Sequence, residues 1–468
     1  MKYRGTLPVL LSAWFMAQFD FFVVNVAAPS IERDLNTGSA SLELIVGGYA
    51  FTYAAGMITG GRLGDRYGYR RLFLLGVAAF TVASVLCGIA VTPAMLVAAR
   101  LLQGLAGAAM VPQVLATISA VYPPHERGRA LGWYGATGGL GSIAGQVLGG
   151  MLLSADLFGL GWRVIFLVNL PVGLIVLPLA GWLLPKIAPP GRARLDLVGA
   201  TGFALALALV LVPLGLGNSL GWPAWTWVCM VLSVPAFALT WRWQRVLGAR
   251  GGQPVLDLAL LKVRSYLAGV GSLVAFMAYF ASFMFTLTLL LQSGLGLTAY
   301  QAGLAFAPMG ILYSITSLVG TRLIRRHGLA VVVAGGTVAA LGLGLLVVAA
   351  GQGLPYVMVG LTLVGAGNGL VLPQLIGAAL VEVAPHQAGV GAGVLSTAQQ
   401  FAGAGGVAVI GAVFFAVAEG GEYVAAMRSS AAVDLVLVLV VVASVAFARR
   451  RATRRVPTTE PSRTAARF

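Results

Sequence analysis

Charged residues are scarce in this chain, and their scarcity decides its class. Of the 468 residues only 9% are Asp, Glu, Lys or Arg, whereas 59% are hydrophobic, and the mean hydropathy is +0.92. A soluble globule of this size needs more polar surface to enclose its apolar residues. The composition therefore excludes an ordinary soluble protein and indicates an integral membrane protein.

Cysteine and histidine are nearly absent as well. Cys87 and Cys229 both lie in apolar segments, so we expect neither a disulfide framework nor a cysteine-based metal site. The three histidines fall in predicted loops and form no cluster with acids or nucleophiles. We therefore expect no enzyme activity, no metal and no cofactor.

Apolar segments of about twenty residues, the length that crosses a bilayer core, follow one another along the chain. There are fourteen, at about residues 6–28, 43–61, 72–91, 95–120, 130–154, 163–184, 196–216, 223–243, 266–291, 301–321, 329–350, 354–381, 390–417 and 431–448. The first segment is long enough to span and lacks a small-residue cleavage site, so we expect it to be retained. The predicted fold is an all-α integral membrane protein with fourteen transmembrane helices.

Positive charge is concentrated in alternate loops. The net charge is +16, and if the chain starts in the cytoplasm, 26 of its 30 Lys and Arg residues lie on the cytoplasmic side. Such a bias sets membrane topology, so we expect both termini in the cytoplasm and no nucleic-acid partner. The basic tail, residues 449–468, is predicted to be a disordered cytoplasmic segment that meets anionic membrane lipid.

An internal repeat divides the chain. Residues 107–132 can be laid on residues 368–393 without a gap, and six positions are identical. These are Pro112 with Pro373, Gln113 with Gln374, Pro124 with Pro385, His125 with His386, Gly128 with Gly389 and Gly132 with Gly393. The repeat predicts two six-helix bundles, residues 1–185 and 251–448, with an inserted pair of helices within residues 186–250.

The loop "GGRLGDRYGYRRLFLLG" at residues 60–76 is expected between the second and third helices. Its glycines permit a tight turn, and its acid can meet an arginine or a helix N-terminus. We interpret it as a conformational latch formed by Gly61, Gly64, Asp65, Arg66, Gly68, Arg70 and Arg71. The loop resembles the signature of the major facilitator superfamily, and fourteen helices with an inserted pair resemble that superfamily's drug:proton antiporters.

Three further segments carry the same resemblance, which covers the chain to about residue 448. They are "FDFFVVNVAAPSI" with Asp20, Asn25 and Pro29, "RLLQGLAGAAMVPQ" with Arg100, Gln103 and Gly104, and "WRVIFLVNLPVG" at residues 162–173. The resemblance implies a proton-coupled transporter that exports amphiphilic drugs, antibiotics or natural products by alternating access, with protons as the coupling ion. A proton-coupled importer of a small organic solute on the same fold remains the alternative.

The fifth helix departs from the antiporter pattern of that family. Gln146 stands where the family usually has proline, whereas the surrounding glycines are retained. A stripe of glycines at four-residue spacing lets another helix approach closely. We predict a helix-packing motif of Gly141, Gly145, Gly149 and Gly150, and a specific role in gating remains open beside ordinary packing.

Asp20 lies within the first span, where a charge costs about 2.5 to 3.5 kcal/mol on insertion scales. Counted along the helices, Asp20 lies roughly 12 Å and Arg100 roughly 9 Å from the outer ends, so their depths are similar. They form either a static ion pair or a proton-coupling site, and the resemblance favours the latter. We expect Asp20 to be the only carboxylate well inside a span, because Asp434 falls near a predicted helix end.

Uncharged polar and aromatic residues within the spans are candidates to line a substrate cavity. They are Phe19, Asn25, Gln113, Gln146, Asn169, Phe276, Tyr279, Phe280, Asn368, Gln374, Gln399 and Gln400. One acid among apolar walls suits a small amphiphilic substrate better than a sugar. The 63 glycines and the excess of arginine over lysine are typical of a GC-rich bacterial genome, so we expect a multi-pass monomer in the bacterial inner membrane.

Overall fold

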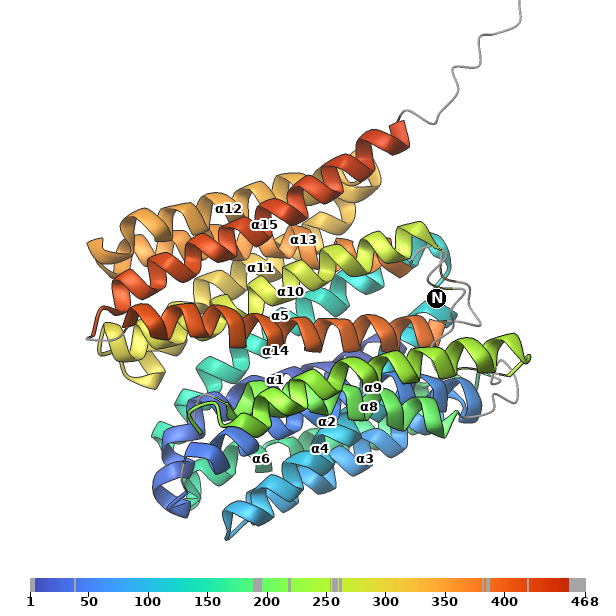
Figure 1. Cartoon of the computed structure of the whole chain (residues 1–468), viewed down its shortest axis with the longest axis horizontal. Coiled ribbons are helices and arrows are strands. Elements are labelled where there is room, and N and C mark those ends of the chain that lie inside the picture. The colour runs from blue at the N-terminus through green and yellow to red at the C-terminus, as the bar shows by residue number, and fades with distance from the viewer. Residues whose placement is uncertain are drawn as a thin grey trace, which may run out of the picture.

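The computed structural model describes residues 5–37, 39–187, 196–217, 220–252, 254, 260, 263–380, 383, 388–418 and 421–453. Within these ranges the chain is all-helical and contains no β-strand, which confirms the predicted fold class. Long helices run side by side along the longest axis of the molecule (Figure 1). This is the arrangement that satisfies backbone hydrogen bonds inside a bilayer.

The first half of the chain supplies six helical rods. These are α1 (Thr6–Leu35), α2 (Ser39–Tyr67), α3 (Tyr69–Gly88), α4 (Pro93–Val121), α5 (Pro124–Ala155), and the pair α6 (Val164–Leu167) and α7 (Asn169–Leu183). Short 3₁₀ turns, η1 (Leu157–Gly159) and η2 (Gly161–Arg163), lead into α6. The inserted pair is α8 (Leu197–Leu216) and α9 (Ala224–Ala249).

The second half again supplies six rods. These are α10 (Arg264–Leu289), α11 (Ala299–His327), α12 (Ala330–Ala349), α13 (Leu354–Leu380), α14 (Ala388–Ala418) and α15 (Tyr423–Thr453). A π-helical turn, η4 (Leu290–Gly294), follows α10, and a 3₁₀ turn, η5 (Ala350–Gln352), follows α12.

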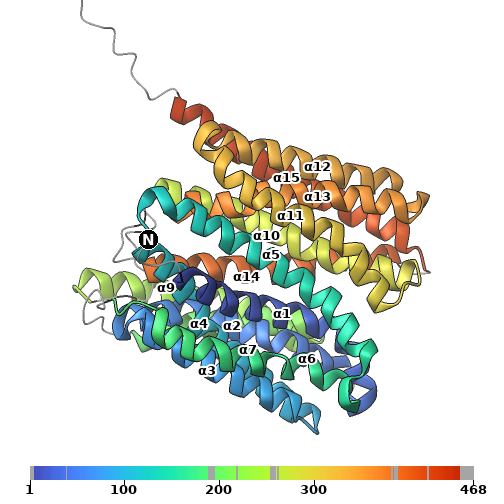
Figure 2. The same cartoon turned by 180° about the vertical axis from the view of Figure 1, so that it is seen from behind.

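Twelve of the described helices are long and apolar enough to cross a membrane, so the predicted count of fourteen is not confirmed. The apolar stretch of α8, Val198–Leu214, is too short to qualify. α2 is long enough but carries charged residues near both ends and many small or hydroxylated residues between them. α1 begins and α15 ends at the same end of the molecule (Figures 1 and 2), as an even number of passes requires.

The contacts between helices recur in the two halves. α1 packs on α5 as α10 packs on α14, α2 packs on α4 as α11 packs on α13, and α3 packs on α4 and α7 as α12 packs on α13 and α15. The sequence repeat therefore corresponds to a repeat of packing, as duplicated transporter halves require. The exact domain boundaries remain a prediction.

Two helix pairs make the most extensive contacts between the halves. α5 packs along α11, and α2 packs along α14. A Cβ on Gly139 would lie 2.1 Å from the ring of Tyr313, so only glycine permits this approach of α5 to α11. Thr397 on α14 donates a hydrogen bond to the Ala54 carbonyl on α2 over 3.3 Å.

The inserted pair lies at the side of this junction. α8 contacts α2 and α14, and α9 packs on α8 (Figure 1). Most side chains of α9 are exposed. An exposed apolar helix is stable where lipid covers it. The inserted pair therefore packs at the periphery of the two bundles.

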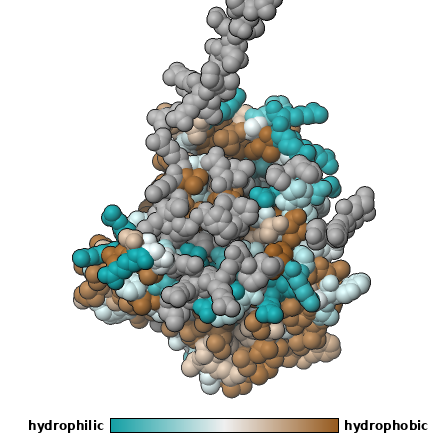
Figure 3. Space-filling model, turned by 90° about the vertical axis from the view of Figure 1, so that its right-hand side faces the viewer, coloured by the Kyte–Doolittle hydropathy of each residue, from teal (hydrophilic) through white to brown (hydrophobic). Residues whose placement is uncertain are grey.

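Figure 3 shows the end of the molecule at which α1 begins and α15 ends. Hydrophilic side chains gather on this end, and hydrophobic side chains flank it. Exposed arginines at helix ends on this side are Arg66, Arg71, Arg129, Arg242, Arg245, Arg250, Arg322, Arg325 and Arg326. At the opposite end the described arginines are Arg33, Arg163 and Arg428. Positive charge therefore distinguishes the two ends of the bundle.

Candidate functional site

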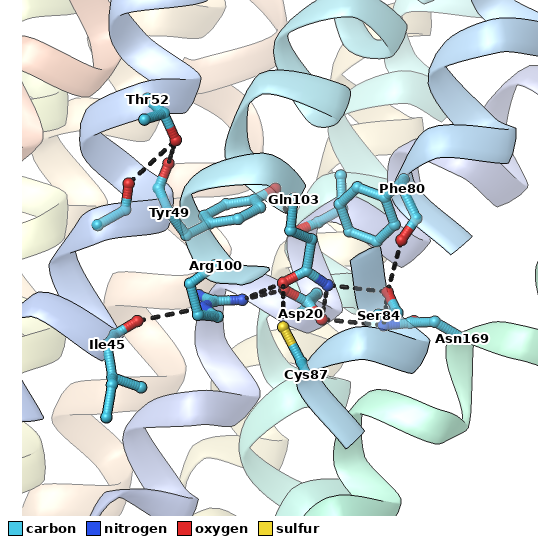
Figure 4. A network of polar contacts seen from close by, with 12 residues as sticks. Asp20, Ile45, Tyr49, Thr52, Phe80, Ser84, Cys87, Arg100, Gln103 and Asn169 are labelled. Atoms are coloured by element: carbon cyan, nitrogen blue, oxygen red, sulfur yellow. Dashed lines mark hydrogen bonds and ion pairs between the residues drawn. The ribbon is translucent and has the colours of Figure 1, made fainter. Parts of the chain in front are cut away.

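Asp20 lies in the middle of α1 and is fully buried, with 0% of its surface exposed. One carboxylate oxygen, Oδ2, lies 2.5 Å from Nη1 of Arg100 on α4. The other, Oδ1, accepts hydrogen bonds from Nε2 of Gln103 (2.8 Å) and Nδ2 of Asn169 (2.9 Å). Figure 4 shows the three donors converging on this one carboxylate. The similar depth expected for Asp20 and Arg100 is confirmed, and both carboxylate oxygens have partners.

Arg100 is also fully buried and is held from several sides. Its Nε donates to the Ile45 carbonyl on α2 (3.1 Å), and its Nη1 also reaches Oε1 of Gln103 (2.7 Å). The guanidinium lies 4.5 Å from the ring centre of Tyr49 and 5.6 Å from that of Phe166. Aromatic faces and carbonyl acceptors offset part of the desolvation cost of a buried cation. Arg100 Nη2 has no hydrogen-bond partner among the described residues.

A further layer of polar contacts comes from α3. Gln103 Nε2 donates to Ser84 Oγ (2.8 Å), Asn169 Nδ2 approaches the same oxygen (3.3 Å), and Ser84 Oγ donates to the Phe80 carbonyl (2.9 Å). Cys87 Sγ lies 3.6 Å from Gln103 Oε1. The network thus links α1, α3, α4 and α7 (Figure 4). The sequence analysis did not identify Tyr49, Ser84 or Cys87 as members of this network. The one sequence feature that pointed to it was Gln103 in the fourth-helix pattern.

Four predicted residues of the second half lie together. The Tyr279 hydroxyl on α10 donates to Asn368 Oδ1 on α13 (2.9 Å). The ring of Phe276 meets Tyr279 edge-on at 5.5 Å and stacks on Phe280 at 6.1 Å. A largely buried aromatic cluster with one amide group therefore lies between α10 and α13.

The expectation that Asp20 is the only acid well inside a span is wrong. Asp434 on α15 is 0% exposed, and its Oδ1 lies 2.8 Å from Oγ of Ser282 on α10. The sequence analysis placed the start of this span at about residue 431. α15 begins earlier, at Tyr423, because the residues before the apolar run are also helical. Asp434 consequently lies inside the helix rather than at its end.

The remaining polar candidates lie apart from Asp20. Gln113 donates to the carbonyls of Gly60 (2.9 Å) and Ala109 (3.0 Å), so it fastens α4 to α2. Gln146 on α5 and Gln374 on α13 are buried at contacts with α11. Gln399 and Gln400 are half-buried on α14, Asn25 is exposed on α1, and Phe19 is buried and stacks on Phe15.

The glycine stripe of α5 lies against α1. A Cβ on Gly141 would lie 2.9 Å from Gln18 Cβ, one on Gly145 would lie 2.8 Å from the Phe19 carbonyl, and one on Gly149 would lie 2.7 Å from Val23. Gly150 is buried beside them. The stripe therefore supports the stretch of α1 that carries Asp20.

The predicted latch is mostly helical rather than a loop. α2 continues to Tyr67 and α3 begins at Tyr69, so only Gly68, with φ of +91°, makes the turn. Asp65 is buried and accepts a hydrogen bond from the Tyr69 hydroxyl (2.9 Å). A Cβ on Gly64 would collide with Gln113.

The other latch residues have different positions. Gly61 is buried, and Arg70 donates to the Gly181 carbonyl at the end of α7. Arg66 and Arg71 are exposed. The hydrogen-bond partners of Asp65 and Arg70 described here thus lie in the first half of the molecule.

Comparison with known proteins extends these findings. Residues 10–407 match the family model described as Major Facilitator Superfamily. The chain is 37% identical over 418 residues to a probable actinorhodin transporter of Streptomyces coelicolor, covering 88% of this chain and 72% of that protein. It is 35% identical to the puromycin resistance protein of Streptomyces alboniger (87% and 81% covered) and 32% identical to a cephamycin export protein of Amycolatopsis lactamdurans (86% and 83% covered).

Solved structures share the fold at low sequence identity. The human organic anion transporter superposes with a TM-score of 0.69 at 17% identity, covering 94% of this chain and 99% of that one. A proton:xylose symporter superposes with a TM-score of 0.63 at 14% identity, covering 94% and 95%. At such identities the likeness is one of fold.

Proposed function

The chain belongs to the Major Facilitator Superfamily, and on that premise we propose that it exports amphiphilic drugs or antibiotics in exchange for protons. Its relatives include named antibiotic exporters and resistance proteins that align along more than four fifths of this chain. The protein is thus a multi-pass membrane transporter of the drug-efflux kind. Proton coupling is the part of the proposal that depends on the site.

The observation that carries proton coupling is the buried ion pair of Asp20 and Arg100 at 2.5 Å. A carboxylate next to a cation holds its proton weakly, and the same group without the cation holds it strongly. If alternating access moves α1 relative to α4, separation of the pair lets Asp20 take up a proton, and re-formation expels it. Gln103 and Asn169 orient the carboxylate for the return of Arg100.

The proposed substrate is a small amphiphilic molecule with an apolar body. The aromatic cluster of Phe276, Tyr279 and Phe280, with the Asn368 amide beside it, is largely buried in this conformation, and we propose that it meets such a body when the two halves move apart. The free Arg100 Nη2 offers a donor in the other half. Few polar groups and broad apolar walls are typical of sites that accept several drugs.

The proposed location is the bacterial inner membrane, with both termini in the cytoplasm. The exposed arginines at helix ends lie where α1 begins and α15 ends, the end on which hydrophilic side chains gather in Figure 3, and cytoplasmic ends carry the excess of positive charge. Anionic lipid headgroups complement this end. We propose that one chain suffices for transport, because both halves of the repeat are present in it.

The test uses proteoliposomes that contain the purified chain and the fluorescent cation ethidium. An imposed proton gradient should drive ethidium against its own gradient, and ethidium should in turn move protons. Asp20→Asn should abolish both effects while downhill exchange of ethidium continues, because asparagine cannot release a proton. Asp156→Asn, which changes an exposed acid after α5, is the matched control. Undiminished coupling in Asp20→Asn would show that the pair is only structural.

An importer on the same fold is the second candidate. It shares the ion pair, so geometry alone does not favour it. Cells that express the chain should accumulate less ethidium than cells with Asp20→Asn if the protein exports, and more if it imports.

A further inference from the structure

A second buried acid lies in the other half of the molecule, between α10 and α15. Asp434 is fully buried, and Ser282 is fully buried opposite it. Asp434 Oδ2 and the hydroxyl of Ser430, one helical turn before it, have no hydrogen-bond partner among the described residues. Unpartnered polar atoms are costly in an apolar interior, and an unpartnered oxygen of an ionised carboxylate costs more than that of a neutral carboxyl group.

The contacts of the Ser282 hydroxyl indicate the protonation state of Asp434. The hydroxyl oxygen lies 2.7 Å from the Ala278 carbonyl, 2.9 Å from the Tyr279 carbonyl and 2.8 Å from Asp434 Oδ1. A hydroxyl has one proton to donate, and a helical serine in apolar surroundings gives it to the carbonyl of the preceding turn. The contact with Asp434 then needs a proton of its own, which an un-ionised carboxyl group supplies.

The surroundings contain no cation that would stabilise an ionised Asp434. No described Lys, Arg or His forms an ion pair with it. The elements packed against α15 are α10, α12, α14, η4 and η5, and α12, α14, η4 and η5 contain no titratable residue. α10 contributes Tyr279 beside Ser282, and it holds Arg264 and Tyr266 at its far end.

The basic residue nearest to Asp434 along α15 is engaged elsewhere. Arg428 donates from Nη2 to the Val348 carbonyl at the edge of α12 and is exposed. A lone carboxylate without a cation is among the most expensive groups to bury. The contact with Ser282 and the lack of a nearby cation among the described residues therefore both indicate that the Asp434 carboxyl group is protonated.

The repeat places this cluster opposite Asp20. The register that pairs Pro112 with Pro373 pairs Asp20 with Ala281, directly before Ser282. The same register pairs Asn169 with Ser430, one turn before Asp434. The two acids thus occupy corresponding helix contacts of the two halves, α1 with α7 and α10 with α15.

We propose that Asp434, with Ser282 as its hydrogen-bond partner, is a second proton-binding site, loaded in the conformation described and emptied when water reaches the contact of α10 with α15. The proposal rests on the proton coupling proposed above and adds a second coupling proton to each cycle. The proton leaves the carboxyl group as hydronium, and the resulting carboxylate takes hydrogen bonds from water, Ser430 and Ser282. Reclosure of α10 on α15 requires a proton to return.

The first experiment detects the proton directly. Infrared spectra of the purified chain at neutral pH should contain the carbonyl stretch of a protonated carboxyl group, and Asp434→Asn should remove it. Glu422→Gln changes an exposed acid just before the same helix and should leave the band intact. Ser282→Ala keeps the acid and removes its partner, so it should shift the band without abolishing it. A spectrum without the band, or a band unaltered by both the Asp434 and Ser282 changes, would overturn the proposal.

The second experiment counts protons per ethidium in proteoliposomes. Asp434→Asn should lower the count by one proton, about half of the total if Asp20 carries the other. An unchanged count together with a carboxyl band would make Asp434 a permanently neutral packing group and would refute the proposal. If the wild-type chain moved no protons with ethidium, the proposed coupling would fail, whereas the infrared band would still decide whether Asp434 binds a proton.

Discussion

The two halves of the molecule repeat the same helix contacts but treat their buried acids in opposite ways. In the first half Asp20 faces Arg100, Gln103 and Asn169, and both of its oxygens have partners. In the second half Asp434 faces only Ser282, and one oxygen has no partner among the described residues. The first cluster is built for a charged pair and the second for a neutral group. A duplicated fold can therefore hold two sites that respond differently to one conformational change.

The largest effect should follow from breaking the charged pair. Arg100→Met leaves Asp20 buried without its cation, and breaking a buried pair typically costs about 3 to 5 kcal/mol. Thermal unfolding of the purified variant in detergent measures the loss. The double variant Asp20→Asn/Arg100→Met should recover most of it.

The control for that prediction lies in the second half. Arg428→Met removes an exposed arginine that contacts only a carbonyl, so it should cost less than about 1 kcal/mol. Equal losses for Arg100→Met and Arg428→Met would mean that the buried pair contributes no more than a surface contact.

Packing should behave alike in both halves. A Cβ added to Gly145 would lie 2.8 Å from the Phe19 carbonyl oxygen. A Cβ added to Gly406, which the repeat register pairs with Gly145, would lie 2.1 Å from the Ala278 carbonyl oxygen. Alanine at either site should cost about 1 to 3 kcal/mol by overpacking. Gly405→Ala, which meets nothing within 4 Å, should be neutral or slightly stabilising because alanine favours helix. If only one of the two alanine variants lost stability, the two halves would share their topology but not the tightness of their helix packing.

The latch should matter in one half only. Asp65→Asn weakens the contact with Tyr69 at the turn from α2 to α3, so we expect a lower transport rate with nearly unchanged ethidium affinity. When residues 61–68 are laid on residues 321–328, Asp65 pairs with Arg325, which is exposed, and Arg325→Gln should leave both quantities unchanged. Loss of affinity at normal turnover in Asp65→Asn would contradict this assignment.

The smallest effect concerns pH at the end of the bundle opposite the termini. Hydrogen bonds from Trp162 (2.9 Å) and Arg163 (2.8 Å) lower the pKa of Asp34 below its ordinary value. The stabilisation is therefore complete above the ordinary pKa, about 4, and is lost as pH falls through the lowered value. Melting temperatures of the wild type and Asp34→Asn should differ at neutral pH and converge in acid. If the difference in melting temperature persisted in acid, the effect of the substitution would come from side-chain packing and not from the charge of Asp34.

Much of the fold could be predicted from the sequence because the bilayer leaves few choices. Long apolar runs must be helices of a set length, and thirteen of the fourteen predicted segments overlap long described helices one to one, the sixth being divided between α6 and α7. The pairing of Asp20 with Arg100 followed from depth, since an acid and a base at one level in a bilayer have few other partners. The sequence analysis predicted a loop for the latch, but most of its residues are helical. Glycines and charged residues usually indicate a solvent-exposed loop, yet a helix end that packs on neighbouring helices tolerates them.

Composition, the order of apolar runs and the internal repeat were enough to predict the class of the protein, the order of its helices, and an acid and an arginine at similar depth. Which face of each helix meets which neighbour depends on the packing of the whole molecule. Each residue turns a helix by about 100°, so an error of two residues in a helix start moves a side chain to another face. For this reason Ser84 and Tyr49 could not be assigned to the Asp20 network in advance, and Asp434 was placed at a helix end when α15 in fact buries it against Ser282.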